Sequence, residues 1–285
     1  MTPMLEVKNL THVYSVGTPF EHTALKDMSF TVEEGEFLGI IGHTGSGKST
    51  LMQHLNGLLK PSQGDILLKG ESIWKDKKTT RAARFRVGLV FQYPEYQLFE
   101  ETVFKDIAFG PKNMGLKEEE IRQRVLRAAR FVGLKEELLE KSPFELSGGQ
   151  KRRVAIAGVI AMEPEVIIFD EPTAGLDPAG CRSILENIKE YRRATGATVL
   201  MVSHSMDDVA LLADRLLVLN KGQIEMLDTP SQVFAHAPRL EEIGLTVPYV
   251  TSLFLRLKEL GLPVDPATYT MEDALKQLLS LKGGA

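Results

Sequence analysis

Hydrophobic and polar residues alternate near the start of the chain and give way to continuous hydrophobic runs further along. The alternation over residues 5–10 and 28–32 predicts half-buried strands of an antiparallel sheet. Uninterrupted apolar runs at residues 37–41, 166–170 and 198–203 are each followed by a loop and a helical pattern. Such runs are typical of buried parallel strands, so we predict an α/β fold with an N-terminal antiparallel β subdomain.

A long helical stretch separates the first of these parallel strands from the later ones. Within it, apolar side chains recur at helical spacing between Ile121 and Val132, and Gly133 marks a helix end. Because the stretch interrupts the strand pattern, we predict an inserted helical subdomain over about residues 93–162.

The strand pattern ends with a predicted β-hairpin, after which helical patterns continue to the end of the chain. Residues 215–220 and 223–228 form the two arms of this hairpin. Apolar stripes at residues 250–257 and 271–278 indicate two amphipathic helices, whose apolar faces would pack within the domain or against a dimer partner. We therefore predict two domains, residues 1–230 and a small C-terminal helical domain at residues 231–285.

Composition limits the class of protein. The chain has 285 residues, of which 43% are hydrophobic, enough for a sizeable core. Its 38 acidic side chains outnumber 34 basic ones, so a basic nucleic-acid-binding domain is not expected. The one cysteine, Cys181, cannot form an internal disulfide, which fits a reducing compartment. No apolar run is long enough to span a bilayer, so we expect a cytosolic protein that reaches a membrane through a partner.

A glycine-rich segment follows the strand at residues 37–41 and precedes a helical run, which is the context that a phosphate-binding P-loop requires. Its glycines let backbone N–H groups point at a phosphate, and the start of the helix adds positive potential. Lys48 is expected to reach the β and γ phosphate oxygens, and Ser49 to ligate Mg2+. The predicted nucleotide-binding residues here are Gly42, His43, Thr44, Gly45, Ser46, Gly47, Lys48, Ser49 and Thr50.

Two adjacent acids, Asp170 and Glu171, end another buried strand. Asp170 is predicted to hold Mg2+ through water. Glu171 would lie nearer the γ-phosphate and act as the general base that polarises the attacking water. An acidic loop that caps a helix is the alternative for an isolated Asp-Glu pair, but the P-loop upstream favours the interpretation as metal ligand and base.

A second predicted anion site lies immediately before the helix at residues 151–162. Ser147 would cap that helix, while Gly148 and Gly149 would let a γ-phosphate approach the backbone closely. At this point the chain resembles the ATP-binding cassette (ABC) ATPase family, for which this segment is the signature motif. The matching residues are Leu146, Ser147, Gly148, Gly149 and Gln150.

The resemblance covers about residues 5–228 and implies further site residues, with ATP and Mg2+ as cofactors. Tyr14, an aromatic residue near the N-terminus, would stack on adenine, and Phe20 and His22 are alternatives for this role. The Q-loop glutamine would contact the metal and take part in catalysis, and the switch histidine would sense the γ-phosphate and take part in catalysis. The resemblance also implies a D-loop aspartate. The matching residues are Tyr14, Gln92, Asp177 and His204. The family further implies a dimer in which the P-loop of one subunit and the signature of another enclose each ATP.

Residues 91–99 and 108–111 resemble a narrower group, the ATPases of energy-coupling factor (ECF) transporters, similar to those of cobalt and nickel uptake systems. The loop at residues 17–21 and the C-terminal tail are closer to the second of the two paralogous ATPase subunits in that group. The resemblance implies the ATP-hydrolysing motor of an importer at the cytoplasmic face of the membrane. Its partners would be a paralogous ATPase in a heterodimer, a membrane-spanning coupling subunit and a membrane subunit that binds vitamins or metal ions. From the chemistry alone, a homodimer would serve equally well.

The segment after Gln92 combines aromatic and acidic side chains suited to holding a partner helix that exposes an arginine. The predicted partner groove consists of Tyr93, Glu95, Tyr96, Phe99 and Glu100. We interpret the basic run at residues 75–86 as a solvated helix face, with contact to a lipid headgroup or nucleic acid as the alternatives. The alternative function is a non-transport ABC ATPase that acts as a nucleic-acid-linked switch. The net negative charge and the absence of a coiled-coil insertion favour the importer.

Overall fold

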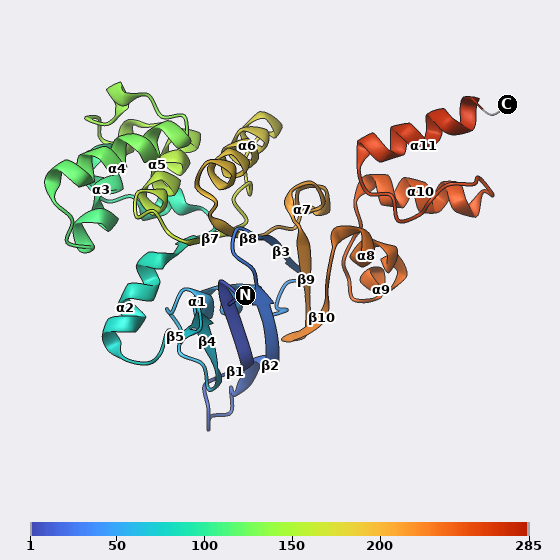
Figure 1. Cartoon of the computed structure of the whole chain (residues 1–285), viewed down its shortest axis with the longest axis horizontal. Helices are drawn as coiled ribbons and strands as arrows, with labels where there is room; N and C mark the ends of the chain where they lie inside the picture. The colour runs from blue at the N-terminus through green and yellow to red at the C-terminus, as the bar shows by residue number, and fades with distance from the viewer. Residues whose placement is uncertain (1, 284–285) are drawn as a thin grey trace.

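Two β-sheets form the centre of this computed structural model, which describes residues 2–283 (Figure 1). The N-terminal sheet has the strand order β2-β1-β4-β5, and all of its pairs are antiparallel. Bulges in β1 between Val7 and Leu10 and again near His12 interrupt the alternation of buried and exposed residues. For this reason the sequence pattern predicted only the first part of this strand. The strands are β1 (Leu5–Tyr14), β2 (His22–Val32), β4 (Gln63–Leu68) and β5 (Glu71–Ser72).

The second sheet has the order β10-β9-β3-β8-β7-β6 and is parallel except for its edge strand β10. Every residue of β3 and β8 is buried, as expected for strands covered on both faces. The parallel arrangement brings the carboxyl ends of β3, β6, β7 and β8 to one edge, where the candidate site lies. The strands are β3 (Phe37–Gly42), β6 (Val87–Val90), β7 (Val166–Asp170), β8 (Thr198–Val202), β9 (Arg215–Asn220) and β10 (Gln223–Asp228).

A group of helices lies beside the second sheet, inserted between β6 and β7 (Figure 1). The helix α4 buries the periodic apolar residues that predicted it, and α5 packs with α3 and α4 into one hydrophobic core that continues into the sheet. Among residues 2–283, no helix is long and apolar enough to cross a membrane. The helical elements here are η1 (Pro94–Gln97), α3 (Val103–Asn113), α4 (Glu118–Phe131), η2 (Glu136–Leu138), η3 (Pro143–Glu145) and α5 (Gly148–Ile160).

After β10 the described chain forms four helices, where the sequence pattern predicted two. The additional ones, α8 and α9, are six residues each, too short to show a helical period, but Phe234 and Leu240 in them are fully buried. A small separate core around Phe254 holds α10 and α11 together. These helices are α8 (Pro230–Ala235), α9 (Ala237–Glu242), α10 (Tyr249–Glu259) and α11 (Met271–Gly283); the remaining helices of the fold are α1 (Lys48–Leu55), α2 (Lys77–Arg86), α6 (Pro178–Thr195) and α7 (Met206–Leu212).

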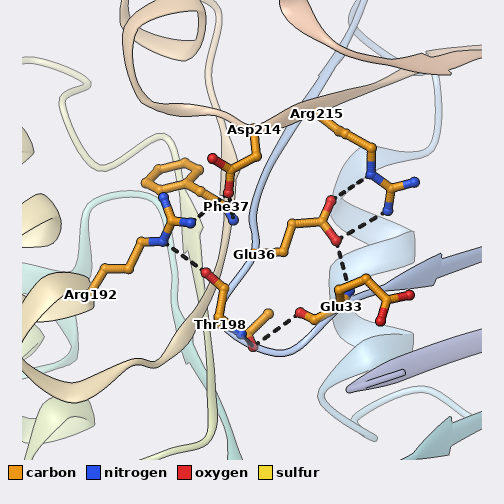
Figure 2. Close-up of polar contacts among 8 residues, drawn as sticks. Glu33, Glu36, Phe37, Arg192, Thr198, Asp214 and Arg215 are labelled. Carbon is orange, nitrogen blue, oxygen red and sulfur yellow. Dashed lines mark hydrogen bonds and ion pairs between the residues drawn. The ribbon is translucent and has the colours of Figure 1, made fainter. Parts of the chain in front are cut away.

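A network of charged side chains lies where β3, β8 and β9 begin, at the end of the second sheet opposite the candidate site. Figure 2 shows the part of it around Glu36, Arg192, Asp214 and Arg215. Arg215 at the start of β9 donates two hydrogen bonds to the carboxylate of Glu36, at 2.7 and 3.1 Å, and a third to the backbone oxygen of Thr31 in β2. Alongside it, Arg192 of α6 pairs with Asp214, whose other contact is the backbone N–H of Phe37. Because Glu36 is buried, the Glu36–Arg215 ion pair lies in a partly desolvated environment.

We expect Glu36→Gln to lower the free energy of unfolding by about 1 to 3 kcal/mol, because it leaves the Arg215 guanidinium without its charged partner. The partial exposure of Arg215 keeps the value below that of a fully buried pair. Urea denaturation measures the change. The matched control is Glu34→Gln, two residues away, which removes an exposed ion pair with Lys69 and should change the stability by less than about 0.5 kcal/mol. Equal losses in the two variants would contradict this role for Glu36.

Candidate nucleotide-binding site

The P-loop joins the end of β3 to the start of α1, as its sequence context predicted. Gly47 adopts a φ of 102°, and a Cβ there would come within 2.8 Å of the backbone oxygen of Ala24, so a side chain cannot be accommodated. The Lys48 ammonium lies inside the loop and donates to the backbone oxygens of Gly42 and His43, at 2.6 and 3.0 Å. Burial lowers the pKa of Lys48, and the nearby carboxylates of Glu171 and Asp170 oppose this shift.

The side chain of His43 braces the P-loop against the strand next to it. One ring nitrogen, Nδ1, lies 2.8 Å from the backbone oxygen of Thr44, and Nε2 lies 3.3 Å from the side-chain oxygen of Asn220 at the end of β9. The Asn220 amide in turn donates to Glu225, which pairs with Arg239 of α9. The P-loop is therefore linked by polar contacts to the C-terminal helices.

Two side chains from the ends of the strands that flank β7 contact Glu171. Gln92 follows β6 and donates from Nε2 to Glu171 Oε2 at 2.9 Å. His204 follows β8, and its Nε2 lies 2.8 Å from Glu171 Oε1. Glu171 itself has a φ of 50°, a conformation unusual for a residue with a side chain, and its backbone N–H donates to Val202. The structure thus brings together the three residues predicted to be catalytic.

Asp170 occupies the last position of β7, half-buried beside Glu171. Burial, together with the negative charge of Glu171, raises the pKa of Asp170 to about 6, against the opposing effects of Lys48 and His204. A divalent cation would relieve this accumulation of negative charge. Among residues 2–283 no cluster of three or more His, Cys, Asp or Glu side chains is arranged to hold a metal ion. Ser49, Asp170 and Gln92 carry oxygen atoms of the kind that Mg2+ prefers, and Mg2+ is usually held by a few protein oxygens together with substrate phosphates.

A cavity of about 510 Å3 lies over the P-loop. Tyr14 and His22, two of the three residues considered for adenine stacking, both line it, whereas Phe20 is 83% exposed. The Tyr14 hydroxyl lies 3.3 Å from the Thr50 hydroxyl. Ala24, on the same strand as His22, also lines the cavity, but an alanine has no functional group that would mark it in the sequence. The lining residues are Tyr14, His22, Ala24, Thr44, Gly45, Gly47, Lys48, Ser49, Thr50, Gln92, Glu171 and His204.

The signature segment lies at the start of α5, in a separate cavity of about 210 Å3. Ser147 and Gln150 form a capping box: the Ser147 hydroxyl accepts from the Gln150 backbone at 3.4 Å, and the Gln150 side chain accepts from the Ser147 backbone at 3.0 Å. A Cβ on Gly148 or Gly149 would meet no atom within 4 Å. These glycines are therefore not required by packing within the chain. Nearby, Asp177 caps α6 by accepting from Gly180 at 2.7 Å.

The predicted partner groove is only partly open. Tyr96 is 85% exposed, and Phe99 is also exposed, with its ring packed edge-on against Phe109. Glu95, however, does not present a free carboxylate, because both of its oxygens accept hydrogen bonds from Arg152, at 2.8 and 3.0 Å. This corrects the sequence-based expectation that Glu95 would offer its charge to a partner arginine. Substitution of Glu95 would first disturb this internal ion pair.

Comparisons with known proteins agree with the arrangement of the site. Residues 25–174 match the family model described as ABC transporter. The energy-coupling factor transporter ATP-binding protein EcfA2 of Caldanaerobacter subterraneus subsp. tengcongensis is 56% identical over 275 residues, which cover 96% of each chain. The protein of the same name from Clostridioides difficile is 54% identical over 280 residues, covering 98% of this chain and 97% of that one.

Two solved structures share the fold. The cbiO1 protein from Clostridium perfringens, part of the ABC transporter complex cbiONQ, gives a TM-score of 0.76 at 41% identity, over 92% of this chain and 98% of that one. The dimeric cassette MJ0796, in a post-hydrolysis state bound to ADP and Pi, gives 0.71 at 31% identity, over 79% of this chain and 98% of that one. The fold and its site therefore define an ABC cassette, which confirms the predicted fold class. The chain belongs to the ABC transporter family, among the ATP-binding proteins of energy-coupling factor transporters, and is an ATPase.

Proposed function

We propose that this chain is the motor subunit of an ECF-type importer, in which ATP binding and hydrolysis drive uptake of a vitamin or a metal ion through membrane subunits. The observation that carries the proposal is the near full-length similarity to an ECF transporter ATP-binding protein, 56% identical over 96% of the chain. The related cbiO1 is itself part of a transporter complex. In this proposal the partner subunits would bind and transport the solute, and this chain would hydrolyse ATP.

In this function the P-loop holds the phosphates of ATP, and Lys48 exchanges its present backbone contacts for phosphate oxygens. Glu171 accepts a proton from the attacking water as that water approaches the γ-phosphate. His204 and Gln92, each within 3 Å of a Glu171 oxygen, orient that carboxylate and respond to the γ-phosphate. Tyr14 or His22 stacks on the adenine.

Ser49, Asp170 and Gln92 would hold Mg2+ in this scheme, directly or through water. When bound, the ion would neutralise part of the phosphate charge during transfer. Asp170 suits this role because it is half-buried at the end of β7 beside Lys48 and Glu171, where a carboxylate needs a compensating cation.

The working unit in this proposal is a dimer, with a paralogous ATPase as the second chain. Two observations support a dimer: the signature segment lies in its own cavity, away from the P-loop, and its glycines serve no packing need within the chain. The glycines would be needed if a γ-phosphate held by a second chain approached the backbone N–H groups at the start of α5. Leu146, Ser147, Gly148, Gly149 and Gln150 would then contact the partner's nucleotide, with Asp177 close to the dimer interface.

The basic run at residues 75–86 comprises α2 and the two residues before it. Of its six cations, four contact groups within the chain: Lys75 pairs with Glu71, Arg81 and Arg84 donate to backbone oxygens, and Arg86 pairs with Glu165. Lys75, Arg81 and Arg84 are exposed, but each already has a partner within the chain. These contacts, together with the net negative charge of the chain, favour the importer over a nucleic-acid-linked switch.

The test is purification of the tagged chain from membranes of cells that also express candidate paralogues and membrane subunits, followed by native mass spectrometry. The proposal predicts an assembly with one copy of this chain, one paralogous ATPase and membrane subunits, at the cytoplasmic face. The same assembly in proteoliposomes should accumulate solute only when ATP is supplied on the side of this chain. An assembly with two copies of this chain would contradict the heterodimer. A chain that stays out of the membrane, and hydrolyses ATP faster when DNA or RNA is added, would overturn the importer.

A further inference from the structure

One buried arginine lies between the two segments that carry Gln92 and Glu171. Arg152 belongs to α5, five residues after the signature serine, and its side chain is 2% exposed. A buried guanidinium costs free energy unless its donors are paired. The groups that pair with Arg152 therefore indicate what this position is for.

On one side, Arg152 holds the segment that follows Gln92. Its Nε and Nη2 donate to the two oxygens of Glu95, at 3.0 and 2.8 Å, in the paired geometry that a planar guanidinium allows. The guanidinium carbon also lies 5.8 Å from the ring centre of Tyr93, which has a left-handed backbone with φ of 53°. Tyr93 and Glu95 belong to the turn that directly continues from Gln92, so Arg152 fixes the path of the backbone there.

On the other side, Arg152 holds the segment that follows Glu171. Its Nη1 donates to the backbone oxygens of Pro172 and Ala174, at 3.3 and 2.6 Å. Pro172 is the residue next to Glu171, and Ala174 lies on the path to Asp177. One side chain thus contacts both backbone segments whose side chains meet in the Gln92–Glu171 hydrogen bond.

We propose that Arg152 is a positioning residue for ATP hydrolysis, which fixes the spacing of these two segments and thereby holds Gln92 against Glu171. The proposal rests on the catalytic roles given above to those two residues. Lysine could not replace it, because a single ammonium cannot donate to Glu95 in a fork and to two backbone oxygens at once. Because α5 begins at the signature segment, a displacement of α5 when a partner's nucleotide docks there would also move both segments.

The experiment measures the steady-state kinetics of ATP hydrolysis by the full-length chain, with any subunits that copurify, and subtracts the turnover that remains in Glu171→Gln. Glu95→Gln keeps the size of the side chain but removes its charge. We expect kcat to fall about tenfold, because the substitution lets the Gln92 segment shift. The KM for ATP should change by less than about twofold, because no P-loop contact is altered. In a Gln92→Ala background the same substitution should lower kcat no further, since the positioned side chain is already absent.

Two further variants separate positioning from stability. Glu95→Gln leaves Arg152 buried without a charged partner, so the melting temperature should fall in either background. Combining Arg152→Met with Glu95→Leu removes both charges and should raise the melting temperature above that of Glu95→Gln, although the Arg152 hydrogen bonds to Pro172 and Ala174 are lost. The kcat should stay low because the two segments are no longer joined. The matched control is Glu136→Gln, which removes an exposed carboxylate paired with Arg130 in the same group of helices and should leave kcat unchanged.

Three results would overturn the role of Arg152: wild-type kcat in Glu95→Gln, wild-type kcat in the doubly substituted apolar variant, or an equal fall with and without Gln92. Failure of the catalytic assignment itself has a different signature. If Glu171→Gln retained wild-type turnover, the proposed base would be wrong. An enzyme that depends on Glu171 but is insensitive to Glu95→Gln would refute the positioning role alone.

Discussion

Glu171→Gln is expected to lower ATP turnover by about 100-fold to 10,000-fold while leaving ATP binding intact. The amide keeps the shape of the side chain, so its neighbours Gln92 and His204 can remain in place. It cannot accept the proton of the attacking water, and that loss affects the rate alone. Turnover is measured by phosphate release, and binding by equilibrium titration with ATP.

Lys48→Ala provides the contrasting variant. It removes the ammonium that lies within the P-loop, so ATP binding itself should weaken by more than about tenfold. Where a second ATPase chain copurifies, its own base would sustain part of the turnover. The comparison is therefore made both with one chain substituted and with both. Wild-type turnover with both chains substituted would exclude Glu171 as the base, and so would a Glu171→Gln variant whose only defect is in binding.

Local patterns predicted the elements of the fold where those patterns were regular. The hairpin predicted at residues 215–220 and 223–228 coincides with β9 and β10, because both arms and the turn lie in one short window. Residues 5–10 gave only part of β1, because bulges change which face each residue occupies. The sequence pattern did not predict α8 and α9, because a helix of six residues is too short to show a periodic apolar face.

The candidate site shows the same limit in another form. The P-loop and the Asp170-Glu171 pair could be located because each lies within one strand-loop segment. That Gln92 and His204 would both reach Glu171 depends on β6 and β8 flanking β7, and strand order is not written in any local pattern. The pairing of Arg152 with Glu95 joins residues 57 positions apart and has no signal, since most arginine and glutamate side chains are simply solvated. For that reason Glu95 was predicted to be free for a partner.

Gly148→Asp, combined with the corresponding substitution in any second ATPase chain that copurifies, is expected to lower ATP turnover by about 100-fold or more without lowering the stability of the folded chain. A Cβ at position 148 meets no atom within 4 Å, and position 148 is the first residue of α5, where a carboxylate interacts favourably with the helix dipole. The substitution should therefore leave the melting temperature unchanged or slightly raised. In the proposed dimer the same carboxylate would face the γ-phosphate held by the partner's P-loop, and the repulsion would prevent the composite site from closing.

The contrast between stability and turnover makes this variant informative about the dimer. ATP binding to the substituted chain's own P-loop should stay normal, because the signature segment occupies a different cavity from Lys48 and Ser49. Gly148→Asn adds nearly the same bulk without the charge and should cost less turnover, which separates electrostatic repulsion from crowding. Gly148→Asp should also abolish ATP-dependent dimerisation. Analytical ultracentrifugation measures this in a Glu171→Gln background, in which the bound ATP is not hydrolysed. If Gly148→Asp hydrolysed ATP at the wild-type rate, the signature segment would not contact nucleotide, and hydrolysis would be complete within one chain.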